Sequence, residues 1–269
     1  IDACLVGSEM CIRDRLNFMN KNISIRLFCE VTLTVGERIN LETEQSHYLK
    51  NVMRCKIGEK ILVFDNYTGE YEAEIVNIHK RFIDIKILEK TKSRCIPGDV
   101  WLIFCPLKKS RTDFLLEKST ELGVRKFLPT LSDKTQTKTI SLNRCRKNIV
   151  EAVEQCGGTF IPEISPISSL SKVIEQQPED RILIFCDETL ESRNINESLL
   201  LERPQKVAVL VGPEGGFSHS ERKLLRTKKN ILPVSLGNRI LRAETAAVSA
   251  LTMWHGMAGD WLKESGSSK

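Results

Sequence analysis

The chain lacks the features that would place it in a membrane or in a metal-binding class. None of its 269 residues belong to an apolar run approaching the roughly 18 residues of a membrane-spanning helix, and no basic segment leads into an apolar signal core. The nine cysteines form no Cys-x-x-Cys pair, and the four histidines are scattered. We therefore expect a cytoplasmic protein with free thiols, no membrane contact and no metal.

Low-complexity tracts and repeats of fixed period are also absent, which argues against disorder and repeat architectures. The length favours one large and one smaller domain. The net charge is only +5, but residues 95–150 carry eleven basic and five acidic side chains. This local excess indicates a surface that meets a polyanion, although a solvated lysine-rich face would explain it equally well.

The N-terminal part of the sequence divides into two regions. Residues 1–23 show no helical or strand periodicity, and we interpret them as a non-native or disordered leader. Residues 24–94 contain stretches of period-two alternation, which predict a small antiparallel sheet or barrel. The expected strands are 24–33, 59–65, 70–79 and 81–90. Residues 47–54 read as a short helix, ending at Arg54, that either closes the barrel or contacts a partner.

The second expected domain, residues 95–269, begins near Pro97 and Gly98 and alternates between strands and helices. Strands that are apolar on both faces and separated by helices predict a parallel sheet covered on both sides, an α/β architecture. The expected strands are 100–105, 126–132, 181–187 and 206–212. The expected helices are 110–122, which ends at Gly123, and 143–156, which ends at Gly157.

Residues 209–221 form the first of two segments that suggest a binding site. A buried strand leads into a loop with Gly212, Gly215 and Gly216, and Ser218 with Glu221 forms a capping box for the next helix. Such a loop lets backbone N–H groups approach a ligand closely. The pattern is neither a P-loop nor Gly-x-Gly-x-x-Gly, and an ordinary tight turn is the less favoured alternative.

Residues 234–254 form the second segment. A short strand ends in a glycine loop, and Arg242 and Glu244 stand at the start of an alanine-rich helix. That helix is apolar nearly all round, so it must be buried on more than one side. A dimer interface and a central position in the core explain this equally well.

The motifs LVGPEGGFS and SLGNRILRAETAAVSAL, preceded by CPLKKSRTDFLLEKSTELGV and IVEAVEQCGG, resemble the bacterial 16S ribosomal RNA uracil N3 methyltransferases of the SPOUT superfamily. The resemblance extends from about Ser24 to Trp261. It implies a PUA-like N-terminal barrel and a C-terminal domain with a trefoil knot. It also implies S-adenosylmethionine as cofactor, 16S ribosomal RNA of the small ribosomal subunit as substrate, and a homodimer.

The resemblance also assigns roles to individual residues. Arg242 would stabilise charge on the uracil carbonyl oxygens, and Glu244 would either accept the N3 proton or orient Arg242. The implied cofactor pocket consists of Leu210, Val211, Gly212, Pro213, Glu214, Gly215, Gly216, Leu236, Gly237, Ile240, Leu241 and Arg242. The implied RNA contacts are Arg54, Lys108, Lys109, Arg111, Lys118 and Gln155. One departure is Gly158, which stands where the family usually has an arginine.

Two alternatives remain open at this point. The first is a knotted methyltransferase with another target, such as a transfer RNA or a ribose hydroxyl. The second is a non-catalytic RNA-binding module. A dinucleotide oxidoreductase fits poorly because the glycine spacing differs.

Overall fold

The computed structural model describes residues 25–189 and 192–262, so the expected leader, residues 1–23, lies outside the described residues. The chain forms two compact units, Ile1–Cys95 and Ile96–Lys269. The division falls one residue beyond the expected boundary after residue 94. Each unit has its own sheet.

The first unit contains a five-stranded sheet in the order β1-β3-β4-β5-β2. The strands are β1 (Arg26–Phe28), β2 (Arg38–Asn40), β3 (Lys60–Phe64), β4 (Gly69–Ile78) and β5 (Ile83–Ser93). The expectation of a wholly antiparallel sheet is wrong for one pair, because β1 runs parallel to β3. The long connection between them, which contains β2, lets the chain return in the same direction.

A short helix, α2 (Thr43–His47), continues into one π-helical stretch, Tyr48–Val52, where the sequence predicted a helix at 47–54. Leu49 of this stretch is fully buried, whereas Arg54 is exposed and has a positive φ of 55°. The helix therefore contributes to the core of the first unit and leaves Arg54 on its surface.

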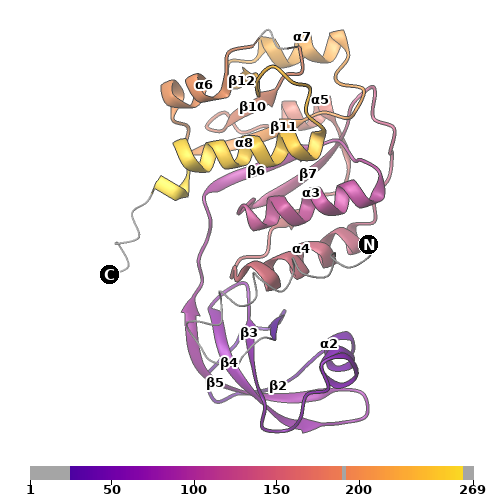
Figure 1. The fold of residues 1–269 in the computed structure, drawn as a ribbon, viewed down its shortest axis with the longest axis vertical. Helices are drawn as coiled ribbons and strands as arrows, with labels where there is room; N and C mark the ends of the chain where they lie inside the picture. Colours follow the sequence, from indigo (N-terminus) through magenta and orange to yellow (C-terminus); the bar gives the residue numbers. More distant parts are fainter. Residues whose placement is uncertain (1–24, 190–191, 263–269) are drawn as a thin grey trace, which may run out of the picture. The chain divides into compact units, whose positions relative to one another are not determined.

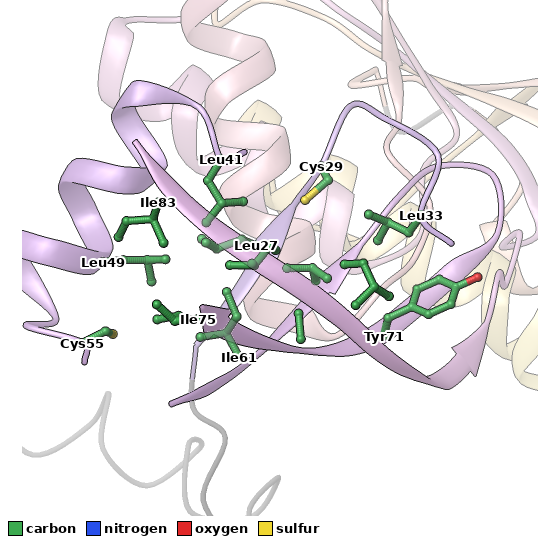
Figure 2. Packing of buried hydrophobic residues seen from close by; sticks show 14 residues of the cluster. Leu27, Cys29, Leu33, Leu41, Leu49, Cys55, Ile61, Tyr71, Ile75 and Ile83 are labelled. Carbon is green, nitrogen blue, oxygen red and sulfur yellow. The ribbon is translucent and has the colours of Figure 1, made fainter. Parts of the chain in front are cut away.

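Alternating side chains build the core of the first unit, as Figure 2 shows for Ile61, Tyr71, Ile75 and Ile83. From Tyr71 to Val76 on β4 and from Ile83 to Leu88 on β5, every second residue is buried and its neighbours are more exposed. This is the burial expected for a sheet with one face on the core. The hairpin predicted around Gly69 is present between β3 and β4, with Gly69 at a φ of 128°.

The second unit contains a seven-stranded parallel sheet in the order β12-β10-β11-β6-β7-β8, with β9 paired to β7. The strands are β6 (Asp99–Phe104), β7 (Lys126–Leu131), β8 (Glu163–Ile164), β9 (Ser168–Ser169), β10 (Ile182–Cys186), β11 (Lys206–Val211) and β12 (Ile231–Val234). The helices are α3 (Lys109–Glu121), α4 (Leu142–Cys156), α5 (Leu170–Glu175), α6 (Ile195–Glu202), α7 (His219–Thr227) and α8 (Ala243–Met257) (Figure 1). The α/β class with a parallel sheet is confirmed; the knot itself stays a prediction.

Strand β11 is buried on both of its faces. Ala208 and Leu210 join a cluster with Val173 of α5 and Leu225 of α7. Val207 and the other alternate residues of β11 are also buried, and α8 contacts this strand. The continuous apolar run read from the sequence therefore reflects a central strand with no solvent-exposed face.

The helix boundaries follow the signals in the sequence. Helix α4 ends at Gly157, which adopts the left-handed conformation with a φ of 75°. The capping box predicted from Ser218 and Glu221 is present at the start of α7. Both helix ends are predicted correctly because the groups that form each cap lie within one turn of one another along the chain.

Helix α8 packs within its own unit through Ala247, Ala250, Leu251 and Trp254, and it contacts α3, α6 and β11. Its central position in the core accounts for much of its apolar surface. Among the helices within residues 25–189 and 192–262, none combines the length and apolarity of a membrane span.

Hydrogen bonds to Asp260 tie the end of α8 to the residue before β6. His255 Nδ1 bonds Asp260 Oδ1, and the backbone N–H of Gly98 donates to Asp260 Oδ2 at 2.9 Å. The ring of Trp261 stacks on His255 with centroids 5.4 Å apart. The hydrogen bond from His255 lowers the pKa of Asp260 to about 2.

We predict that Asp260→Asn lowers the free energy of unfolding at neutral pH by about 2 kcal/mol, because the folded state favours the charged carboxylate. A carboxyl with a depressed folded pKa stabilises above its unfolded pKa, so the difference from the wild type shrinks as pH falls from about 4 to about 2. Urea unfolding at several pH values measures this. The control Asp180→Asn removes an exposed pair with Lys206 and changes stability little. Equal effects of both variants would contradict the assignment.

Candidate active site

Three neighbouring strands end at the same edge of the second sheet. Strands β11, β10 and β12 are adjacent and parallel, with Leu210 paired to Phe185 and Cys186 paired to Val234. The carboxyl ends of parallel strands lie together, and ligands of such sheets bind in the crevice outside them. The loops after these strands therefore converge on one place.

These loops enclose a cleft of about 240 Å³. The lining residues are Cys186, Asp187, Glu188, Val211, Gly212, Pro213, Glu214, Gly216, Leu236, Gly237, Arg239, Ile240, Leu241, Arg242, Ala243 and Ala246. The two glycine-bearing strand ends recognised in the sequence thus meet in one cleft. Ten of the residues that the resemblance assigned to the cofactor line it.

Leu210 and Gly215, which were assigned to the cofactor, do not line the cleft. Leu210 belongs to the buried apolar cluster, because successive residues of β11 point to opposite faces and Val211 takes the cleft side. Gly215 faces Lys134, whose Cβ would lie 3.2 Å from a Cβ placed on the glycine. Neither residue has a side chain that could reach the cleft.

Two of the cleft glycines have no room for a side chain. A Cβ on Gly212 would lie 2.7 Å from the Phe217 ring, and a Cβ on Gly216 would collide with the Glu188 carboxylate. Gly216 also has a φ of 66°, which L side chains rarely adopt. Close packing therefore requires glycine at both positions.

Two acidic cleft residues, Asp187 and Glu188, were not anticipated from the sequence. Glu188 Oε1 accepts from Arg222 at 2.5 Å and from the Phe217 backbone at 3.2 Å. Burial raises the pKa of Asp187, but hydrogen bonds, the first from Arg226, lower it below its usual value overall. Asp187 ends the predicted strand 181–187 and Glu188 follows it, and only the order of the strands places them beside the glycine loops.

Cys186, at the end of β10, also lines the cleft. Desolvation raises the pKa of its thiol to about 12. The group is therefore a neutral thiol at physiological pH, which favours a packing role over a nucleophilic one.

Arg242 and Glu244 flank the start of α8 but lie in different surroundings. Arg242 is exposed and lines the cleft. Glu244 is only 9% exposed and does not line it. Within the described residues, the ion pair recorded for Glu244 is with Arg111, whose Nε lies 3.8 Å from Glu244 Oε1, and none joins it to Arg242.

The residues assigned to RNA contact differ in whether their side chains are already paired with carboxylates. Lys108 and Lys109 at the start of α3, and Gln155 near the end of α4, are exposed. Lys118 is held by Glu117 and Glu121 at 2.8 and 2.9 Å. Arg111 is tied to Glu214 at 3.2 Å in addition to Glu244. Two of the expected phosphate contacts are thus already paired with carboxylates.

Comparison with known proteins supports the class of domain that this fold and cleft define. The model of an RNA methyltransferase domain matches residues 94–255, and that of an RNA methyltransferase PUA domain matches residues 41–88. The ribosomal RNA small subunit methyltransferase E of Buchnera aphidicola subsp. Schizaphis graminum is 33% identical over 90% of this chain and 99% of its own.

Two solved structures are similar to the whole fold. The ribosomal RNA small subunit methyltransferase E of Neisseria gonorrhoeae, bound to S-adenosylmethionine, is 27% identical, covers 88% of this chain and 99% of its own, and has a TM-score of 0.80. A Legionella pneumophila protein in complex with the same cofactor is 28% identical, covers 88% and 98%, and has a TM-score of 0.81.

The second unit is thus an RNA methyltransferase domain of the SPOUT type. The chain belongs to the ribosomal RNA small subunit methyltransferase E family.

We predict that Gly212→Ala lowers the free energy of unfolding by about 1–3 kcal/mol, because the added Cβ displaces the buried Phe217 ring. Gly256→Ala, on the exposed side of α8, meets nothing within 4 Å and is the matched control. It should leave stability unchanged or raise it by up to about 1 kcal/mol. Thermal and urea unfolding compare the two. Equal stability of both variants would show that the glycine loop is not closely packed.

Proposed function

We propose that this protein transfers a methyl group from S-adenosylmethionine to N3 of a uracil in 16S ribosomal RNA of the small ribosomal subunit. The observation that carries the proposal is that both glycine loops line one cleft at the ends of β10, β11 and β12. Family membership supports the reaction and the kind of RNA.

The residues of the cleft fit S-adenosylmethionine. Gly212 and Gly216 line the cleft without side chains, so a ligand can approach the backbone of this loop closely. Ile240 lines the cleft, and its side chain is 83% exposed. This side chain can pack against an apolar ring of the ligand. Asp187, Glu188 and Glu214 also line the cleft, and each is paired with an arginine, so they offer a ligand hydrogen-bond acceptors rather than unpaired negative charge.

The bound cofactor supplies an electrophilic methyl group, so the protein's tasks are alignment and charge placement. Uracil N3–H is a weakly acidic imide and reacts as its anion. Arg242, exposed where the cleft meets the start of α8, stabilises negative charge that develops on the flanking carbonyl oxygens. Glu244 lies two residues further into the helix, where it pairs with Arg111.

Binding of RNA is assigned to exposed basic and polar side chains. Lys108, Lys109 and Gln155 lie on α3 and α4 or at their ends, where the excess of basic charge is found. Arg54 adds a basic group on the first unit, the part that matches the PUA domain. The target base must leave its stack to reach a cleft, which suits a partly single-stranded site in structured RNA.

We also propose that the protein acts as a homodimer. Large apolar side chains are exposed on α6, at Leu200 and Leu201, and after α8, at Trp261 and Leu262. Helix α8 contacts both α6 and the 3-10 turn Asp260–Leu262 that holds Trp261 and Leu262. Exposed apolar groups of this kind are typical of surfaces that bind another protein.

The most informative test combines binding and transfer. Calorimetric titration with S-adenosylhomocysteine should give saturable binding of one ligand per chain. Incubation with S-adenosylmethionine and small ribosomal subunits from cells lacking the activity should then methylate a uracil at N3, mapped by mass spectrometry. Binding without transfer would favour a non-catalytic RNA-binding module, and a methylated ribose hydroxyl or transfer RNA would indicate another target.

Arg242→Ala should lower kcat by about 10²–10³, since it removes a preorganised positive charge. We expect the affinity for S-adenosylhomocysteine to change less than the turnover, because most of the cleft is intact. The two quantities are measured on the same preparation. Near-normal turnover would remove Arg242 from the mechanism.

A further inference from the structure

The hairpin that joins β4 to β5 in the first unit ends in a turn of exposed residues, His79 to Phe82. The backbone N–H of His79 donates to the carbonyl oxygen of Phe82 at 2.9 Å, so Lys80 and Arg81 occupy the two central positions. Two-residue hairpin turns favour asparagine and glycine, because these residues adopt the required backbone conformations most easily. Backbone preference therefore does not explain two long cationic side chains at this turn.

An aromatic pair stands beside these cations. The rings of His79 and Phe82 stack on one another, with centroids 4.3 Å apart and an interplanar angle of 29°. The stack leaves the His79 side chain 44% exposed and Phe82 38% exposed. An exposed aromatic stack can be extended by a further flat ring, and every nucleobase has a π-face that suits this.

The ring of His79 is held in a fixed orientation by Asp84. His79 Nε2 lies 2.9 Å from Asp84 Oδ2, and Asn77 Nδ2 donates to the same oxygen at 3.2 Å. The hydrogen bond from His79 lowers the pKa of Asp84, so the carboxylate is ionised at neutral pH and Nε2 is the donor. The ring is therefore oriented before a ligand arrives, which reduces the entropy lost on binding.

The charge at this turn is positive. Lys50 Nζ donates to the carbonyl oxygen of His79 at 3.4 Å, so a third cation joins Lys80 and Arg81. The carboxylate at the turn, Asp84, already pairs with His79. Within residues 25–189 and 192–262, no ion pair is recorded for any of the three cations. They are therefore available to bind an anion such as phosphate.

We propose that this turn binds an unpaired base of the substrate RNA, which stacks on the His79–Phe82 pair. The three cations, Lys50, Lys80 and Arg81, bind the adjoining phosphates. The inference rests on the proposed function in that RNA is the substrate. Stacking together with positive charge favours a single-stranded nucleic acid over a duplex, whose bases cover one another, and over an acidic peptide, which lacks a flat ring at each residue.

Binding of two RNA probes to the full chain tests this site. The probes are a single-stranded oligouridylate of about ten nucleotides and a duplex RNA of the same length, each titrated over a range of salt concentrations without cofactor. The variants are Phe82→Ala, Phe82→Tyr, Lys80→Ala and Arg81→Ala. The matched controls are Tyr67→Ala, an exposed aromatic at the turn before β4, and Lys56→Ala, an exposed lysine at the turn before β3. Thermal unfolding checks that each variant is folded.

The wild type should bind the single strand more tightly than the duplex. Phe82→Ala should weaken single-strand binding by about tenfold with an unchanged salt slope, because it removes a stacking surface and no charge. Phe82→Tyr should bind like the wild type, because a phenol ring also stacks. Lys80→Ala and Arg81→Ala should each reduce the salt slope by about 0.7, the value for one phosphate contact on a single strand. Both controls should bind like the wild type.

Transfer to small ribosomal subunits gives a second measurement. Phe82→Ala should raise KM more than it lowers kcat, because the lost contact serves binding of the RNA in the ground state as well as in the transition state. If Phe82→Ala does not fold, Phe82→Leu, which keeps an apolar side chain without a ring, carries the same test.

Wild-type affinity of Phe82→Ala for the single strand, or an equal loss in Tyr67→Ala, would overturn the stacking site. Unchanged salt slopes in both Lys80→Ala and Arg81→Ala would show that the turn is a solvated basic tip. Equal affinity of the wild type for the two probes would contradict recognition of an unpaired base. Because RNA binding is measured without cofactor, a wild type that fails to methylate uracil would refute the proposed function while the binding data still decide this inference.

Discussion

The site depends on one constraint, the adjacency of β12, β10 and β11 in a parallel sheet. Parallel strands end at the same edge, so segments near residues 187, 212 and 237 converge although they lie far apart in the sequence. The apolar burial of β11 on both faces holds this edge within the core. The loops are therefore free to be glycine-rich and open to a ligand without loss of the framework that holds them.

The charges around the cleft follow from the same arrangement. Asp187 and Glu188 accept hydrogen bonds from Arg226 and Arg222 of α7. Because α7 follows the glycine loop, the helix after one cleft loop holds the acidic residues of another. On the other side, Arg111 of α3 joins the glycine loop to α8. Helix α3, which was expected to supply RNA contacts, thus also supplies ion pairs within the protein. The exposed Lys108 and Lys109 at its start remain for phosphate.

The features that the sequence predicted are those with a local cause. The capping box at Ser218, the end of α4 at Gly157 and the apolar strands of the second unit each depend on a few neighbouring residues. The features that it missed depend on distant partners. The parallel pairing of β1, the acidic residues after β10 and the bond from Arg111 to Glu214, 103 residues away, require the order of the strands. The sequence resemblance placed Arg111 with the RNA contacts because spacing alone does not show which carboxylates face it.

The central claim, that three strand ends form one cofactor cleft, is tested most directly by a crystal structure of the protein with S-adenosylhomocysteine. The account predicts the ligand between the loops 211–216 and 236–242, against the acidic residues after β10. Ligand density elsewhere, with this cleft filled only by solvent, would contradict it.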